Sequence, residues 1–193
     1  MTFKLIQDIK NAIAATMPDN TTGQITPAIL RNVLLDMCDS LFSRAGALYG
    51  ALGVAGVAQS ITTVPTNFPV LMPNAINNNP TLLTVNAITG LITALVGGFG
   101  VTLSYNVVWM SATNNVELDA AVYKNGVVYA RGKMGQNGAT QNKQNTGGFS
   151  VLVAGVAAND IFELRLSSPQ GPTSITFYSM DFTVSINPTL TSL

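Results

Sequence analysis

The sequence has little charge and no histidine. Only 9% of its 193 residues are charged, against about 25% in typical soluble proteins, and nine basic residues balance nine acidic ones. The absence of histidine excludes Ser-His-Asp and Cys-His catalysis and most zinc sites. The single cysteine, Cys38, cannot form a disulfide within one chain. We therefore expect a protein that is not an enzyme and that has no catalytic, cofactor or metal site.

This shortage of charge also bears on partners. Hydrophobic residues make up 47% of the chain, and a soluble monomer of this kind needs a charged surface to stay dispersed. We therefore expect identical copies to cover one another in a homo-oligomer. Balanced charge gives no electrostatic footprint for nucleic acid. The most apolar stretch, residues 45–58, is shorter than the ~20 residues of a spanning helix, and we expect neither a membrane segment nor a secretory signal.

The first 43 residues predict two short helices. Phe3, Ile6, Ile9, Ile13 and Met17 recur at three- and four-residue steps, and Thr26 followed by Pro27 is typical of a helix start. Two such helices bury too little area to fold alone. They either fold back on their own domain or form an anchoring arm, which we favour. The predicted docking interface of this arm consists of Ile9, Ile13, Leu30, Val33, Leu34, Met37 and Leu41.

Residues 44–59 are mostly small, and we expect them to form a linker whose conformation the sequence leaves open. From residue 60 to 193 the pattern predicts strands. Residues 98–110 alternate between apolar and small or polar side chains, which is typical of a strand with one buried face. We expect eight to ten strands and an exposed loop over residues 132–148. The predicted fold is therefore mainly β: an antiparallel jelly-roll β-sandwich preceded by two α-helices.

Two local signals refine this prediction. Asn125-Gly126 lies between two apolar runs, which is the strongest short-range signal for a β-hairpin because both residues tolerate positive φ. In the last strand the apolar parity changes near Tyr178 and Ser179, which predicts a β-bulge.

Few residues offer chemistry. Glu117 and Asp119 are two residues apart on an expected strand, and paired carboxylates serve glycosidases, but a solvated strand face is the favoured interpretation. Asp160 and Glu163 are expected to be turn and surface residues. Exposed aromatic side chains can contact sugars or a neighbouring subunit, with the subunit favoured. The candidates for such contacts are Tyr123, Tyr129 and Tyr178.

Several segments together resemble a known family. Residues 89–92, 97–103, 121–126, 148–150, 160–164 and 179–184 are similar, in this order, to the jelly roll of the tumour-necrosis-factor and complement-type proteins, over about residues 60–187. The resemblance implies a tight trimer around an apolar three-fold axis, and many viral and phage proteins carry such a module. The chain lacks an obvious acidic metal-binding cluster, which argues against a calcium role. Residues 25–37 are similar to a helical arm at the start of phage virion proteins.

We therefore predict a structural virion protein, assembled in the bacterial host cytoplasm. The favoured function is a trimeric capsid decoration, or cement, protein whose arm docks to the major capsid protein or another virion protein. The alternative is a head- or tail-fibre protein that binds a host surface glycan. An enzyme such as a polysaccharide hydrolase is least favoured.

Overall fold

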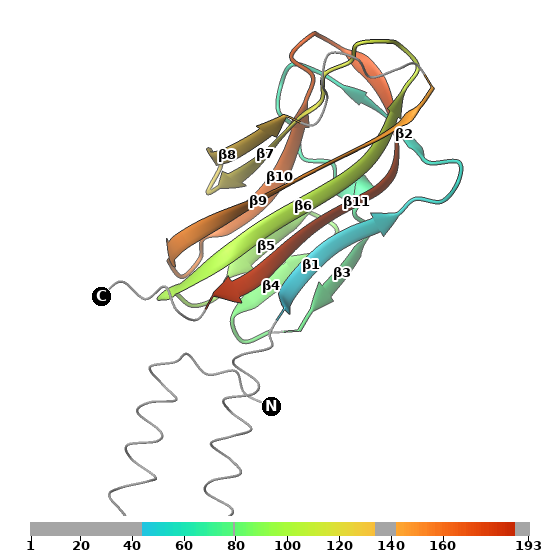
Figure 1. Cartoon of the computed structure of the whole chain (residues 1–193). Helices are drawn as coiled ribbons and strands as arrows, with labels where there is room; N and C mark the ends of the chain where they lie inside the picture. The colour runs from blue at the N-terminus through green and yellow to red at the C-terminus, as the bar shows by residue number, and fades with distance from the viewer. Residues whose placement is uncertain (1–43, 79, 134–141, 188–193) are drawn as a thin grey trace, which may run out of the picture.

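The computed structural model describes residues 44–78, 80–133 and 142–187. The two predicted helices and all seven residues of the predicted docking interface, from Ile9 to Leu41, lie outside the described residues. The described residues form two antiparallel β-sheets that pack face to face, with one short 3-10 helix, η1 (Pro69–Leu71) (Figure 1). The prediction of a mainly β, antiparallel sandwich is confirmed for this part of the chain.

The two sheets have different strand orders. Sheet A has the order β3 (Asn74–Asn77), β1 (Arg44–Ala51), β11 (Thr173–Asn187), β6 (Phe99–Ser111) and β9 (Gln144–Val156), and β2 (Val57–Ile61) also pairs with β11. Sheet B has the order β4 (Leu83–Asn86), β5 (Leu91–Ala94), β10 (Ile161–Ser167), β7 (Asp119–Lys124) and β8 (Val127–Lys133).

The strand pairs are nested along the chain. β1 pairs with β11, β5 with β10, β6 with β9 and β7 with β8, all antiparallel. The domain thus resembles one long hairpin, with its tip at the β7–β8 turn, rolled so that alternate pairs fall into opposite sheets. This is the connectivity of a jelly roll.

The core lies between the sheets and follows the predicted alternation. In β6, the alternate residues Val101, Leu103, Tyr105, Val107 and Trp109 are buried, and the side chains between them face outward. β11 contributes one buried set before its bulge and another after it, because the register with β6 shifts between Phe177 and Ser179. The predicted β-bulge is confirmed. It lets both halves of this long strand direct their apolar side chains inward.

The hairpin prediction at Asn125-Gly126 is also confirmed. Asn125 has φ of 53° and Gly126 has φ of 77°, and the two residues connect β7 to β8. Positive φ at both central positions matches the right-handed twist of the flanking strands.

Three expectations about segment boundaries need correction. Residues 44–59 are not a linker, because they form β1 and the start of β2, both paired with β11. Their small residues allow close packing: a Cβ on Gly50 would lie 2.1 Å from the carbonyl oxygen of Leu71. The expected loop at 132–148 is shorter, since β8 extends to Lys133 and β9 begins at Gln144. The described residues contain eleven strands rather than eight to ten.

Phe182 tests how strongly the fold depends on β11. Its side chain is fully buried, whereas its neighbour Thr183 faces outward. Phe182→Ala should lower the free energy of unfolding by about 3–5 kcal/mol, because it removes a buried ring and leaves a cavity. Thr183→Ala, the matched control, should change it by less than about 1 kcal/mol. Urea unfolding followed by tryptophan fluorescence measures both, and equal losses would contradict the assignment of Phe182 to the core.

Candidate assembly face

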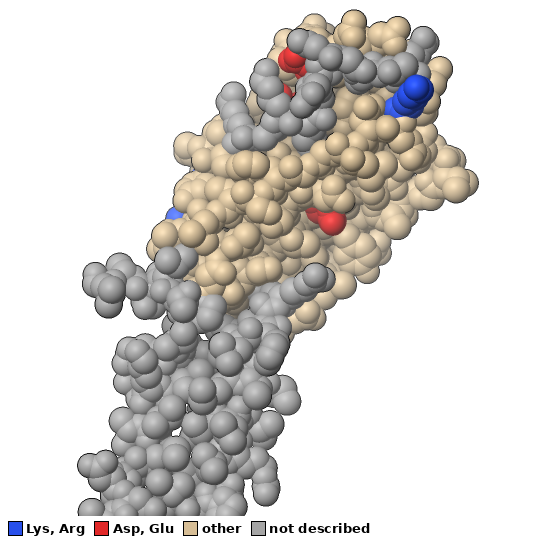
Figure 2. Space-filling model, viewed as in Figure 1, with Lys and Arg blue, Asp and Glu red and all other residues tan. Residues whose placement is uncertain are grey.

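The outward side of sheet A is a grid of side chains that is nearly free of charge. The strand register aligns its residues in four rows, which we call the sheet A face. The rows are Ala51, Ser179, Val108 and Thr146; Asn74, Tyr49, Asp181, Asn106 and Gly148; Ile76, Ala47, Thr183, Ser104 and Ser150; and Arg44, Ser185, Thr102 and Leu152. Figure 2 shows this side as a continuous uncharged surface with one acidic group near its middle.

Hydroxyl and amide groups of the sheet A face bond to one another. The hydroxyls of Ser104 and Ser150 are 2.8 Å apart, and Asn187 Nδ2 donates to Thr102 Oγ1 at 2.7 Å. The Thr183 hydroxyl donates to the carbonyl oxygen of Ser104 at 3.3 Å. Because these groups already have partners within the sheet, covering them with another surface costs less than covering unpaired polar groups.

Asp181 is the only carboxylate among the described residues of the sheet A face. It lies directly opposite Tyr49 on β1 and Asn106 on β6. Its Oδ1 atom is buried and has no hydrogen-bond partner among the described residues. Burial raises the pKa of Asp181 above its ordinary value, although backbone N–H groups of Asn106 and of Asp181 itself act in the opposite direction.

The outward side of sheet B has a different character. Arg165 forms an ion pair with Glu163, and its guanidinium lies 4.2 Å from the ring centre of Tyr123, close enough for a cation–π contact. Two expectations fail at this place. Tyr123 is only 5% exposed and Glu163 only 8%, so neither is the exposed residue that the sequence suggested. The guanidinium of Arg165 covers part of the Tyr123 ring and pairs with the carboxylate of Glu163.

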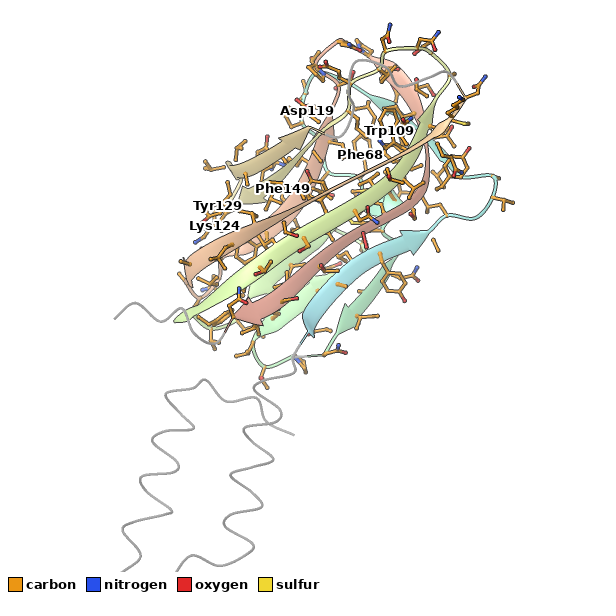
Figure 3. All side chains as sticks on the ribbon, viewed as in Figure 1. Phe68, Trp109, Asp119, Lys124, Tyr129 and Phe149 are labelled. Atoms are coloured by element: carbon orange, nitrogen blue, oxygen red, sulfur yellow. The ribbon has the colours of Figure 1, made fainter. Side chains whose placement is uncertain are left out.

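The β8–β9 edge of the sandwich carries two of the exposed aromatic residues, Tyr129 and Phe149, and a third, Tyr49, lies on β1. Tyr129 on β8 is 43% exposed, and its hydroxyl donates to the carbonyl oxygen of Leu152 on β9 at 3.4 Å. Phe149 on β9 packs near the ring of Tyr105, with 6.2 Å between ring centres (Figure 3). Tyr129 thus links the two sheets at their open edge. The third predicted aromatic, Tyr178, is half-buried, and its hydroxyl donates to Met110 Sδ.

Asp160 holds the hairpin tip against the turn between β9 and β10. Its carboxylate accepts hydrogen bonds from Lys124 Nζ at 2.8 Å, from Asn125 Nδ2 at 2.7 Å and from the N–H of Ala157 at 2.7 Å. Asn125 Oδ1 in turn accepts from the N–H of Ile161. Asp160 is 5% exposed, so its expected surface position is wrong, although Asn159, with φ of 67°, does form the predicted turn.

The carboxylates of Glu117 and Asp119 have different surroundings. The N–H of Glu117 bonds to Gln170 Oε1 in a loop, whereas Asp119 begins β7 and pairs with Ser167. Asp119 Oδ1 is buried without a hydrogen-bond partner among the described residues. Burial, with a smaller contribution from the Asp119 charge, raises the pKa of Tyr105 to about 12. The prediction that Glu117 and Asp119 share one solvated strand face is therefore wrong. Glu117 lies before β7, and one carboxylate oxygen of Asp119 is buried.

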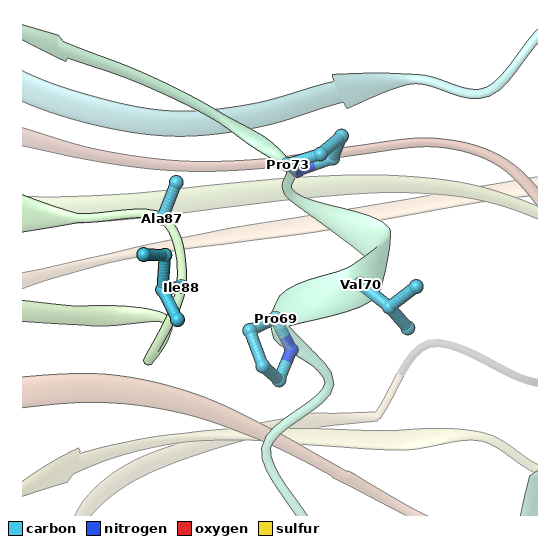
Figure 4. Close-up of a pocket in the computed structure, with 5 residues that line it drawn as sticks. All are labelled: Pro69, Val70, Pro73, Ala87 and Ile88. Carbon is cyan, nitrogen blue, oxygen red and sulfur yellow. The ribbon is translucent and has the colours of Figure 1, made fainter.

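The described part of the chain also contains a shallow apolar hollow. Its lining comes from η1 and the β4–β5 turn and consists of Pro69, Val70, Pro73, Ala87 and Ile88 (Figure 4). None of these side chains can transfer a proton or bind a metal. Among residues 44–78, 80–133 and 142–187, no group of three acidic, histidine or cysteine side chains could hold a metal ion. The same residues include no helix of the length and hydropathy that a membrane span requires.

Comparison with known proteins finds likeness in fold only. No family model matches the sequence, and no curated protein matches it. Among solved structures, the Eiger TNF from S. frugiperda is 11% identical over 71% of this chain and 90% of its own, with a TM-score of 0.41. The vertex protein P5 of PRD1 is 18% identical over 74% of this chain and 97% of its own, with a TM-score of 0.46.

Asp160 gives the domain a defined sensitivity to acid. Burial alone would raise the pKa of Asp160, but the bonds from Lys124, Ala157 and Asn125 outweigh it, and the pKa is lowered. The carboxylate therefore contributes stability above its unfolded pKa of about 4, and this stability is lost as the pH falls through the lower folded value. Asp160→Asn should cost about 2 kcal/mol at pH 7 and progressively less below pH 4.

Urea midpoints at pH 7 and pH 3 measure this difference. Glu117→Gln, which removes a carboxylate outside this cluster, serves as the control and should not reproduce the pH-dependent loss of Asp160→Asn. An Asp160→Asn protein that loses the same stability at both pH values would show that the ionised carboxylate is not the stabilising group.

Proposed function

We propose that the chain is a non-enzymatic structural subunit of a bacteriophage particle and that it assembles as a homotrimer. The observation that carries this proposal is the sheet A face, which extends across five strands with a single carboxylate. Exposed sheet faces of monomers usually carry many charges, which keep the molecules apart. A neutral, internally bonded face suits permanent contact with a neutral partner, and a second copy of this chain is such a partner.

The dimensions of sheet A support this role. β6 has 13 residues. β3, β1, β11 and β9 have 4, 8, 15 and 13 residues, so at about 3.4 Å per residue and about 4.8 Å between strands the five strands cover roughly 860 Å². A stable interface needs about 800 Å² from each partner. The sheet A face is therefore large enough to hold an oligomer together.

A charge placed on the sheet A face should break the assembly. Thr146 on β9 is exposed at the edge of sheet A, and Thr84 on β4 is exposed at the edge of sheet B. Thr146→Lys should shift the solution mass from three chains toward one chain of 20.2 kDa, because an unpaired ammonium would be buried in the contact. Thr84→Lys, the matched control, should leave the trimer intact.

Light scattering on the full chain at micromolar concentration measures both variants. A wild-type protein that is a monodisperse monomer would refute the assembly proposal. Equal behaviour of the two lysine variants would show that the contact lies elsewhere.

Within the particle, we assign the subunit to the decoration, or cement, class. Support comes from residues 1–43, which precede the β-sandwich and carry the predicted apolar stripe of the arm. An amphipathic arm that precedes a self-associating domain can lay its apolar side into a groove of another virion protein, with the major capsid protein as the proposed partner. The resemblance of residues 25–37 to phage virion arms favours the same role.

Two adjacent leucines test the arm. Leu34 lies on the predicted stripe, whereas Leu35 lies about 100° away from it on a helix. Leu34→Asp should reduce co-sedimentation with purified particles at least tenfold, and Leu35→Asp should reduce it much less. Light scattering confirms that both variants keep the wild-type mass. Undiminished binding of Leu34→Asp would refute docking through this stripe.

The alternative, a fibre protein that recognises a host glycan, stays a prediction with less support. Sugar rings stack on exposed aromatic faces. Of the three predicted contact residues, Tyr123 is buried and Tyr178 is half-buried against Met110, so only Tyr129 offers much exposed ring. Selective binding of the full chain to a glycan array, abolished by Tyr129→Ala, would favour this alternative.

A further inference from the structure

The sheet A face contains one feature that does not fit a permanently neutral contact. Asp181 lies near the middle of the face, on the central strand β11, with uncharged neighbours on both sides. A carboxylate at this position becomes more buried when another subunit covers the face. Burial of an ionised carboxylate without a cation is costly, so the group must gain a partner or take up a proton.

The neighbours of Asp181 provide no cation. On β1 it faces Tyr49, on β6 it faces Asn106, and along β11 its outward neighbours are Ser179 and Thr183. Beyond Tyr49, the next residue of the row is Asn74 on β3. The titratable groups near it are thus tyrosines, Tyr49 in its own row and Tyr178 further along β11. The one described basic residue in the rows of the sheet A face is Arg44, which pairs with Ser185, four residues from Asp181 along β11.

The surroundings of the Asp181 Oδ1 atom favour the protonated, neutral carboxyl group over the ionised carboxylate. It is buried and lacks a hydrogen-bond partner among the described residues, so the ionised carboxylate is only partly compensated in the single subunit. A second copy that covers the middle of the face adds further uncharged surface there, because the one basic residue of the described rows, Arg44, stands at the end of the face. Assembly therefore favours a proton on Asp181.

We propose that Asp181 makes self-association through the sheet A face depend on pH, with assembly favoured in acid and weakened as the carboxylate ionises. This inference rests on the proposed homo-oligomer and adds the group that regulates it. The raised pKa of Asp181 in the isolated subunit points in the same direction. Covering the face raises this pKa further, so each subunit binds more protons when it is assembled than when it is free.

The sign and size of the effect follow from proton linkage. Since the assembled state binds more protons, the association constant falls as the pH rises between the free and the assembled pKa of Asp181. The fall is up to tenfold per pH unit for each subunit that takes up a proton. The window opens above the ordinary aspartate pKa of about 4, because burial has already raised the free value.

The experiment measures the solution mass of the full chain by analytical ultracentrifugation in a dilution series from pH 4.5 to pH 8. The wild type should dissociate at progressively higher concentration as the pH rises. Asp181→Asn keeps the size of the side chain and removes its charge, so it should remain assembled across the whole range. Glu117→Gln, which removes a carboxylate that is not part of the sheet A face, should behave like the wild type.

The outcomes separate this inference from the proposal on which it rests. A wild type that is oligomeric with the same affinity at every pH keeps the assembly and overturns the role of Asp181. If Asp181→Asn dissociates with rising pH as the wild type does, the role of Asp181 is also overturned. Weaker assembly of the wild type in acid overturns it as well, because it would mean that the ionised carboxylate binds a cation of the partner. A wild type that is monomeric at every pH overturns both the proposed homo-oligomer and the role of Asp181. Should Asp181→Asn fail to fold, Asp181→Ser replaces it, with the same expected loss of pH dependence.

Discussion

The structure depends on how β11 is paired. This strand lies in the middle of sheet A, where it pairs with β6 on one side and with β1 and β2 on the other. The bulge between Phe177 and Ser179 corrects the parity of its side chains, so that Ile175 and Phe177 before it and Phe182 after it all reach the core. Without that extra residue, one half of the strand would direct its apolar side chains to solvent.

The bulge in β11 also determines which side chains lie on the outward side of sheet A. Because Met180, Phe182 and Val184 point inward, Asp181 and Thr183 must point outward. The uncharged grid and its one carboxylate are therefore a direct consequence of the register that builds the core. The outward side of sheet B differs, because it carries an ion pair: Arg165 pairs with Glu163, and its guanidinium lies over the ring of Tyr123.

Local patterns in the sequence predicted much of this fold. The alternation over residues 98–110, the Asn125-Gly126 turn and the bulge near Tyr178 each depend on neighbouring residues, and each is present in the structure. The strand β1 was missed, because its Gly and Ala residues resemble a linker until the close approach of Leu71 to Gly50 is known. Burial of Tyr123 and Asp160 was missed for a similar reason, since Arg165 on Tyr123 and Lys124 and Asn125 on Asp160 come from distant segments. The sheet A face is a long-range product of four register relations, and only the low overall charge indicated that such a face should exist.

The nested pairing also determines where the chain enters and leaves the sandwich. Arg44 at the start of β1 pairs with Ser185 near the end of β11, so the described domain begins and ends at the same end of the sandwich (Figure 1). The loops at 62–65, 112–118 and 168–172 lie at the other end, where β2, β6 and β11 meet. Exposed turns tolerate added length far better than paired strands do, which applies to 62–65 more than to 112–118, where Val116 and Leu118 belong to the core. The start and the end of the described domain therefore share one end of the sandwich, and a peptide inserted into an exposed part of these loops would lie at the opposite end.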